Sequence, residues 1–241
     1  DEIGHFEPLV HFLHKIGGEH LSQSRLSLLI NGEEKFPDVL KTLEGAERHI
    51  HMEYYAWEND QTGNKIKEVL VKKRAEGVQV RVLYDDFASA KIKKNIVREL
   101  KEAGVEFYPQ IKILLGQLAN RLNHRDHRKI IVVDGTVGFV GGINISDRYD
   151  NSIDTGLFWR DTHVKITGPL VLSLQRHFAV SWNTSTPAKV EFGNDLFPDA
   201  KVVASERVSQ GQIIAGGPIY PKSNIMLSYF KIFTLAREKL Y

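Results

Sequence analysis

The 241-residue sequence contains no cysteine, which excludes disulfide bridges, thiolate zinc sites and iron–sulfur clusters. It also contains no apolar run of about eighteen or more residues, the length that a transmembrane helix needs. The longest candidate, 130–143, is interrupted by Asp134. The chain begins at Asp1 and shows no signal peptide. We therefore expect a soluble fragment without a transmembrane segment, cut from a parent protein in which membrane helices can precede Asp1.

The sequence also lacks a strong excess of charge of either sign. Lysine and arginine number 32 against 30 aspartates and glutamates, which gives a net charge of +2 at pH 7. Proteins that bind nucleic acid usually concentrate basic residues on one face, and this sequence has no basic stripe of that kind. Nucleic acid is therefore not an expected partner. The 42% of hydrophobic residues is ordinary for a globular domain with a full core.

Strand-like and helix-like segments alternate along the first half of the chain. Short β-rich runs predict strands over 25–30, 49–57, 78–86 and 105–109, and the segments between them predict helices over 36–46, 64–75 and 91–103. This alternation indicates βαβ units. The runs "KIIVVD" and "VGFVGG" then flank a tight turn and predict a hairpin. The expected class is α/β, with a mixed, mainly parallel sheet and helices on both faces.

The segment 111–122 spaces its leucines and isoleucines as an amphipathic helix does. Packing on the sheet is the favoured interpretation, because most amphipathic helices of globular domains pack in that way. A short interfacial helix that dips into lipid stays open as an alternative.

The stretch "NHRDHRKIIVVDG", residues 123–135, places ionisable side chains directly before an apolar strand. Side chains two residues apart on a strand share a face, so His127 and Lys129 point the same way and His124 points to the other. A neighbouring ammonium group opposes protonation of an imidazole, which keeps His127 neutral and nucleophilic. The same ammonium group attracts anions. The pair is therefore a candidate attack site on a phosphate ester.

Two other interpretations of these histidines carry less weight. A metal site is disfavoured because Lys129 would repel a cation and no third and fourth ligand is evident. A lone histidine is by default a hydrogen-bonded core residue, but the surroundings of His127 favour chemistry. They include the run "GFVGGIN", in which Gly141 and Gly142 allow close approach of the backbone to a ligand, and Asn144 can donate its amide to a phosphate oxygen.

This spacing resembles the HKD signature of the phospholipase D superfamily. The residues that fit it are His127, Lys129, Asp134, Gly141, Gly142 and Asn144. The chain is most similar to the bacterial cardiolipin synthase branch of that superfamily, through the segments "NGEEKF", "HIHMEYY", "NHRDHRKIIVVDG", "GFVGGINISDRY" and "WRDTHVKITGP" in the expected order. The resemblance covers nearly the whole chain from about residue 25.

The resemblance implies an α/β/α sandwich half-domain that works as a pair, with a second HKD half in the parent chain or in a homodimer mate. One histidine attacks phosphorus and the other protonates the leaving alcohol, through a covalent phosphohistidine. No metal or other cofactor is implied. In the cardiolipin synthase branch, two phosphatidylglycerol molecules condense to cardiolipin and glycerol. The implied partners are thus a phospholipid and the bacterial membrane surface.

The resemblance also implies roles for the phosphate-contacting residues. His127 takes the nucleophile's role, because the first copy of the motif usually supplies it. Lys129 and Asn144, with the backbone at Gly142, would hold the nonbridging phosphate oxygens. They would stabilise the charge of the pentacoordinate transition state.

Two acidic residues complete the candidate catalytic set. Asp161, in "WRDTH", stands where the family places an acid that accepts the other ring N–H of the histidine. Asp134 belongs to the signature but ends its strand before Gly135, which favours a role in organising the turn and the nearby charges. Glu53 and Tyr54 either border the pocket or belong to a buried glutamate–cation pair.

Other functions stay open within the same signature. Water competes with an alcohol for a phosphohistidine, so a hydrolytic phospholipase D or a dimeric nuclease is the first alternative. A lipid-binding half that is silent without its second HKD motif is another. Segments similar to cardiolipin synthases away from the site, and the lack of a basic stripe, favour lipid transfer.

Three parts are predicted along the chain: an N-terminal helical segment over 1–24, a first HKD domain over 25–222 and the truncated start of a second repeat over 223–241. The last assignment rests on an internal similarity. A shift of 190 residues sets "FKIFTLAREKLY" (230–241) against "LKTLEGAERHIH" (40–51). Lysine then matches lysine, alanine matches alanine, and apolar residues match apolar residues.

Overall fold

The computed structural model describes residues 4–110, 125–193, 195–199, 208–217, 219–220 and 222–239. Within these ranges, no helix has both the length and the apolar composition required to cross a bilayer. His124 and the predicted helix over 111–122 lie outside the described residues.

The described elements confirm the alternation of strands and helices. The helices are α1 (Glu7–Gly17), α2 (Asn31–Glu44), α3 (Gln61–Ala75), α4 (Ile96–Glu102), α6 (Leu170–Ser185) and α7 (Asn224–Leu235), with short 3₁₀ turns at Ala90–Ile92 and Asp147–Tyr149. The strands are β1 (Ser22–Ile30), β2 (His49–Tyr54), β3 (Gln79–Tyr84), β4 (Glu106–Pro109), β5 (Lys129–Val133), β6 (Val137–Gly141), β7 (Thr162–Thr167) and β8 (Ser209–Gly211).

The strands form one sheet in the order β4-β3-β2-β5-β6-β7-β1-β8. The α/β class with helices on both faces is confirmed, but the expectation of a mainly parallel sheet is wrong. Pairing is parallel only across β2, β3 and β4. The other described neighbours, from β2–β5 to β1–β8, are antiparallel.

The change of direction has a local cause. Helices α3 and α4 separate β2, β3 and β4, so each strand returns in the same direction. Between β5 and β6 the chain has only a short turn, in which Asp134 and Gly135 adopt positive φ angles of 54° and 68°. Two such residues are typical of the tight turn that joins antiparallel strands.

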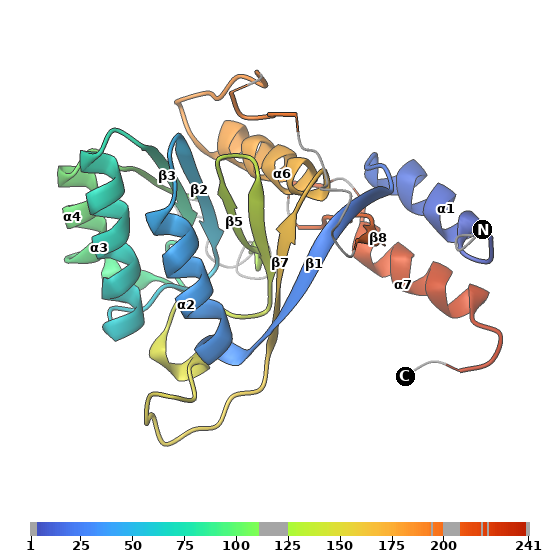
Figure 1. Ribbon diagram of the computed structural model, residues 1–241, viewed down its shortest axis with the longest axis horizontal. Helices are drawn as coiled ribbons and strands as arrows, with labels where there is room; N and C mark the ends of the chain where they lie inside the picture. Colours follow the sequence, from blue (N-terminus) through green and yellow to red (C-terminus); the bar gives the residue numbers. More distant parts are fainter. Residues whose placement is uncertain are drawn as a thin grey trace, which may run out of the picture.

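The sheet is covered on two faces (Figure 1). Helices α2, α3 and α4 lie on one face and α6 lies on the other, while α1 and α7 lie side by side at the end of the sheet that β1 and β8 form. The larger core is formed between the sheet and the first face, by residues such as Phe36, Trp57, Ile66, Leu100 and Phe107. On the α6 face, apolar contacts come from Leu170, Val171, Leu174, Phe178 and Trp182.

Helix α2 begins five residues before the predicted start at 36, because the run "NGEE" forms its first turn. Asn31 opens the helix with a φ of 58°. The Glu34 carboxylate accepts a hydrogen bond from the Ile30 N–H at 2.7 Å, which satisfies one donor that the first turn leaves unpaired. This early start makes Lys35 part of the helix and buries its side chain between the helix and the sheet.

The strand directions bring five chain segments to one edge of the sheet. Strand β5 begins where its neighbours β2 and β6 end, because both are antiparallel to it. Tyr54 thus pairs with Lys129, and Gly141 pairs with His163 at the start of β7. The end of β3 lies at the same edge, since β3 is parallel to β2. Residues just beyond these strand ends therefore meet in space.

Candidate active site

His127 is presented by a turn that precedes β5. The side chain of Asp126 is buried and accepts a hydrogen bond from the backbone N–H of Arg128 at 3.0 Å. This two-residue spacing is the pattern of an Asx turn. Because the Asp126 side chain points into the protein, His127, which lies between Asp126 and Arg128, is exposed to solvent.

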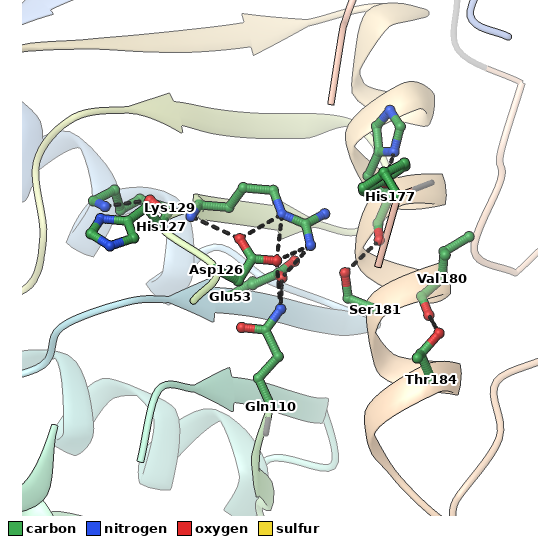
Figure 2. Close-up of polar contacts among 11 residues, drawn as sticks. Glu53, Gln110, Asp126, His127, Lys129, His177, Val180, Ser181 and Thr184 are labelled. Atoms are coloured by element: carbon green, nitrogen blue, oxygen red, sulfur yellow. Dashed lines mark hydrogen bonds and ion pairs between the residues drawn. The ribbon is translucent and has the colours of Figure 1, made fainter. Parts of the chain in front are cut away.

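A buried polar cluster anchors this turn (Figure 2). Figure 2 shows Glu53, Asp126 and Gln110 meeting between His127 and helix α6. The amide of Gln110 donates to Glu53 at 2.6 Å and to Asp126 at 2.7 Å. The guanidinium of Arg128 bonds to Asp126 and lies 3.2 Å from Glu53. The buried Glu53 thus lies beside a cation, as one of its two interpretations predicted, but the Tyr54 ring is not part of this pair and lies 5.0 Å from the ammonium group of Lys35.

The two carboxyl groups of this cluster have pKa values shifted in opposite directions. Burial raises the pKa of Glu53 to about 8, while the Arg128 guanidinium opposes that shift. Asp126 behaves in the opposite way, because its hydrogen bonds with Arg128 and Gln110 outweigh burial and lower its pKa. The cluster therefore keeps Asp126 ionised, which preserves the turn that presents His127.

The imidazole of His127 lies flat against a tyrosine. The ring of Tyr55, the residue after β2, stacks on it with 3.8 Å between ring centroids and 18° between planes. The pKa of His127 is lowered from its ordinary value of 6.5, first by partial burial and then by the cation of Lys129, with Asp85 and Asp126 acting in the other direction. His127 is therefore neutral at pH 7, as predicted.

Lys129 lies at the first position of β5, and its side chain is 7% exposed. Its ammonium group donates to the backbone carbonyl of His127 and lies 5.3 Å from the centre of the Tyr55 ring. Burial lowers the pKa of Lys129 to about 8, opposed by the carboxylates of Asp126 and Asp161. The lysine thus carries its charge at pH 7 and loses it a little above.

The two glycines at the end of β6, Gly141 within the strand and Gly142 directly after it, are needed for close packing rather than for a turn. A Cβ atom on Gly141 would lie 2.5 Å from Nδ1 of His163, and one on Gly142 would lie 2.2 Å from Oδ1 of Asp161. Both distances are far inside van der Waals contact. The N–H of Gly142 donates to the Thr162 carbonyl at 3.1 Å, so this residue contributes space for a carboxylate.

Hydrogen bonds hold Asp161 through its backbone N–H and through its carboxylate. Its backbone N–H donates to the Asn31 side chain at 2.9 Å, and its carboxylate accepts from the Thr162 N–H at 2.7 Å and from Nε1 of Trp159 at 3.3 Å. Its charge acts on Lys129. Among the described contacts it forms no hydrogen bond with His127, so that predicted bond stays a prediction.

Asn144 is fixed through both ends of its carboxamide. Oδ1 accepts from the Ala56 N–H at 3.1 Å, and Nδ2 donates to the hydroxyl of Tyr149 at 2.9 Å. The side chain is 7% exposed. An amide nitrogen carries two hydrogens, so Nδ2 retains a second N–H beyond the bond to Tyr149.

The buried side chain of Lys35 holds the loop that carries Asn144. It has no exposed surface, and its ammonium group donates to the carbonyls of Ile143 at 2.9 Å and Asn144 at 3.4 Å. The Tyr54 ring centre lies 5.0 Å away. Burial lowers the pKa of Lys35 well below its ordinary value, and the Asp161 carboxylate opposes the shift. A single buried amine thus joins α2 to the loop that carries Asn144.

Replacing Lys35 with methionine is expected to destabilise the protein. Methionine keeps most of the volume but leaves the two carbonyls buried without a donor, which costs about 1–3 kcal/mol. For a domain of this size we expect the midpoint of thermal unfolding to fall by roughly 5 °C. Lys41→Met is the matched control, because Lys41 lies on the same helix and is exposed. Equal midpoints for the two variants would contradict this role.

Asp134 lies at the opposite end of β5 from His127. Its carboxylate accepts hydrogen bonds from the backbone N–H groups of Glu47, Arg48 and His49, each at 2.8 Å. Five strand residues span about 16 Å, so the structure does not bring this side chain to His127. Its position is that of a residue that organises the turn and the entry to β2.

Sequence reasoning missed two residues next to the candidate set, Tyr55 and Lys35. Tyr55 follows a strand that the sequence extends to residue 57, whereas β2 ends at Tyr54. If the strand continued to residue 57, alternation would place Tyr55 on one face of the sheet. Alternation does not predict that the Tyr55 ring stacks on His127, which is distant in the sequence. Lys35 falls between the predicted strand over 25–30 and the predicted helix over 36–46. The sequence did offer a signal for Lys35, because this residue directly precedes Phe36, the first apolar residue of the predicted helix.

Solved structures with 16–17% sequence identity share the fold. The phospholipase D family member Nuc from Salmonella typhimurium superimposes with a TM-score of 0.53, covering 69% of this chain and 99% of that one. NucT from Helicobacter pylori gives a TM-score of 0.51, covering 64% of this chain and 93% of that one. Phosphatidylserine synthase from Haemophilus influenzae Rd KW20 gives 0.52, covering 72% and 40%. The fold is therefore that of phospholipase D-like proteins.

Sequence relatives define the family more narrowly. A family model described as cardiolipin synthase, PLD-like domain, matches residues 39–182. The chain is 41% identical over 238 residues to a cardiolipin synthase of Geobacillus thermodenitrificans, covering 98% of this chain and 47% of the relative. It is 39% identical over 241 residues to cardiolipin synthase 2 of Bacillus anthracis, covering 98% and 46%. The chain belongs to the PLD-like cardiolipin synthase family and spans about half the length of these curated relatives.

Proposed function

We propose that this chain is the N-terminal half of a cardiolipin synthase, in which His127 becomes phosphorylated during transfer of a phosphatidyl group. The observation that supports the proposal most directly is the placement of His127. A neutral imidazole stands on the exposed side of its turn, stacked on Tyr55, while the ammonium group of Lys129 lies under the same turn. Relatives of the chain at 37–41% identity carry the name cardiolipin synthase.

In the first step, a ring nitrogen of His127 forms a bond to the phosphorus of phosphatidylglycerol, and the bond from phosphorus to the headgroup glycerol breaks. The glycerol oxygen leaves with the electron pair and takes up a proton. In the second step, a hydroxyl of another phosphatidylglycerol attacks the phosphohistidine and gives up its proton. Cardiolipin forms and the neutral imidazole is restored, so two easier displacements replace one difficult displacement.

The leaving alkoxide needs an acid, and the same acid acts as the base in the second step. A single half supplies one HKD histidine. The second histidine would come from another HKD half in the parent chain or in a homodimer mate. Phospholipid substrates would bring the parent protein to the surface of the bacterial membrane.

The surrounding residues have separable roles in this reaction. The charge of Lys129 and the second N–H of Asn144 Nδ2 would stabilise the nonbridging oxygens of the transition state. Asp161 would hold Lys129 charged and, in the assembled parent, accept the remaining ring N–H of His127. Gly142 provides room for that carboxylate, and Asp134 maintains the turn at the far end of β5.

Product analysis tests this proposal. The full-length parent protein, supplied with phosphatidylglycerol vesicles, is expected to form cardiolipin and glycerol in equal amounts. Formation of phosphatidic acid alone would show that water is the acceptor and would contradict phosphatidyl transfer. The matched blank is the same protein with the His127→Ala substitution, which separates this activity from lipid hydrolysis by contaminants.

A further inference from the structure

Helix α7 exposes a face that is almost entirely apolar. Along this face the exposed fractions are 48% for Ile225, 53% for Met226, 57% for Tyr229, 58% for Phe230 and 52% for Phe233. The opposite side of the helix, with Asn224 and Ser228 buried, is turned inward. Figure 1 shows α7 beside α1, and the ammonium group of Lys231 lies 5.7 Å from the centre of the Phe12 ring of α1.

The exposed face of α7 matches the buried face of α2. With the shift of 190 residues found in the sequence, Lys35, Phe36, Val39 and Leu43 of α2 correspond to Ile225, Met226, Tyr229 and Phe233 of α7. The four residues of α2 are buried against the sheet, and the four of α7 are exposed. Twelve aligned positions, of which only a lysine and an alanine are identical, say little alone, but the exposed apolar positions of α7 also follow the pattern of the buried positions of α2.

The inward side of α7 completes the comparison. Asn224 and Ser228 correspond to Glu34, which is exposed on α2, and to Asp38, which is partly exposed. Helix α7 is thus placed with its solvent-type side buried, where Asn224 donates to the Ala215 carbonyl, and with its core-type side outward. A helix in this state has a surface that is built to pack on a sheet.

We propose that this face of α7 is covered, in the parent protein, by the sheet of a second α/β half, in the way that α2 packs on the sheet of the first half. The inference rests on the two-half arrangement of the proposed function and assigns α7 to the second half, as the helix that corresponds to α2. The curated relatives are about twice as long as this chain, which leaves enough sequence for such a half.

A lipid surface is a weaker candidate for the occupant. Interfacial helices usually pair an apolar face with a strongly charged one that is rich in lysine and arginine. Over Asn224–Leu235 the only charged residue is Lys231. Its contact with the α1 ring directs that charge toward the protein rather than toward lipid headgroups.

The first test introduces charge on this face in the full-length parent protein. The double variant Met226→Glu/Phe233→Glu is expected to lower the midpoint of thermal unfolding by about 10 °C or more, because it places carboxylates in an apolar interface. The matched control is Thr234→Glu, on the same helix. Thr234 corresponds to Glu44, which is exposed on α2, so the control midpoint is expected to stay within about 1 °C.

The second test needs no substitution and therefore does not depend on the folding of a variant. The chain contains two methionines, Met52 without exposed surface and Met226 at 53% exposure. Peroxide oxidises exposed methionine to the sulfoxide. In the monomeric parent protein we expect Met226 to be oxidised at least about tenfold more slowly than in the unfolded protein, as is expected for Met52. Peptide mass spectrometry measures both rates in one sample.

Three outcomes would overturn the proposal. Rapid oxidation of Met226 in the folded parent would show that the face is free. Protection that appears only with phosphatidylglycerol vesicles would assign it to lipid, and protection that appears only in a dimer would assign it to a second copy. All of these readings are independent of turnover, so a parent protein without transferase activity would contradict the proposed function and leave this interface standing.

Discussion

Replacing His127 with alanine is expected to lower phosphatidyl transfer by the full-length parent protein by about 10⁴-fold or more, the scale of loss when an enzyme loses its nucleophile. The structure gives the reason, because the imidazole is neutral and stands on the exposed side of a turn that a buried cluster anchors. The covalent intermediate should disappear as well. Brief incubation with phosphatidylglycerol labelled in its phosphate, followed by denaturation, should label the wild-type protein and not the variant.

His124→Ala is the matched control for this experiment. It removes a histidine three residues away, at odd spacing from the catalytic pair, and we expect most of the activity to remain. Thermal unfolding of both variants within about 2 °C of the wild type would show that neither change acts through stability. Equal losses of activity in the two variants would mean that His127 is not the nucleophile, or that both histidines are structural.

The sequence correctly predicts that two apolar strands, β5 and β6, carry the residues of the candidate site at or near their ends. Lys129 pairs with Tyr54 at the first position of β5, whereas His127 lies in the turn before the strand, so the two residues lie at the same end of β5 but not on the one strand face that was predicted. Gly141, Gly142 and Asn144 follow the neighbouring strand to the same edge. These residues meet because β5 begins where its antiparallel neighbour β6 ends.

Relations between distant segments were not accessible in the same way. The stack of Tyr55 on His127 depends on where β2 ends, and strand ends are set by pairing partners rather than by local sequence. The contact of Lys35 with the Ile143 carbonyl depends on a helix that starts before its predicted first residue, 36. Mistaking the sheet for a mainly parallel one has a related cause, because the βαβ rhythm of the first half does not continue after β4.

Asp134 shows why membership of a signature does not by itself define a role. The spacing places it with His127 and Lys129, yet its carboxylate binds three backbone N–H groups at the other end of the strand. Those bonds join the β5–β6 turn to the start of β2, which keeps β2 and β5 in register. Tyr54 and Lys129 are paired at the site because that register is fixed.

Removing the cation at position 129 is expected to give the second largest effect. Lys129→Met should lower kcat/KM by about 10²–10³-fold, the usual loss when one donor to a developing oxyanion is removed. Methionine fills the space of the buried side chain, so the loss reports the charge rather than a cavity. If kcat/KM for phosphatidylglycerol stayed within about twofold of the wild type, Lys129 would not contact the phosphate.

The pH dependence of the reaction provides a sharper test of the same residue. Transfer needs His127 neutral, and because burial and the Lys129 cation lower the pKa of this imidazole from its ordinary value of 6.5, the acid decline of the rate should lie below that value. It also needs Lys129 protonated, and because the pKa of this lysine is lowered to about 8, the rate should fall again as the pH rises through that value. Arginine keeps its proton to far higher pH. In Lys129→Arg, the alkaline decline should therefore disappear below about pH 10 even where the absolute rate is reduced, since the longer, planar side chain fits the site less well. An alkaline limb that stayed near pH 8 in this variant would belong to another group, such as Glu53 with its raised pKa or the acid supplied by the second half.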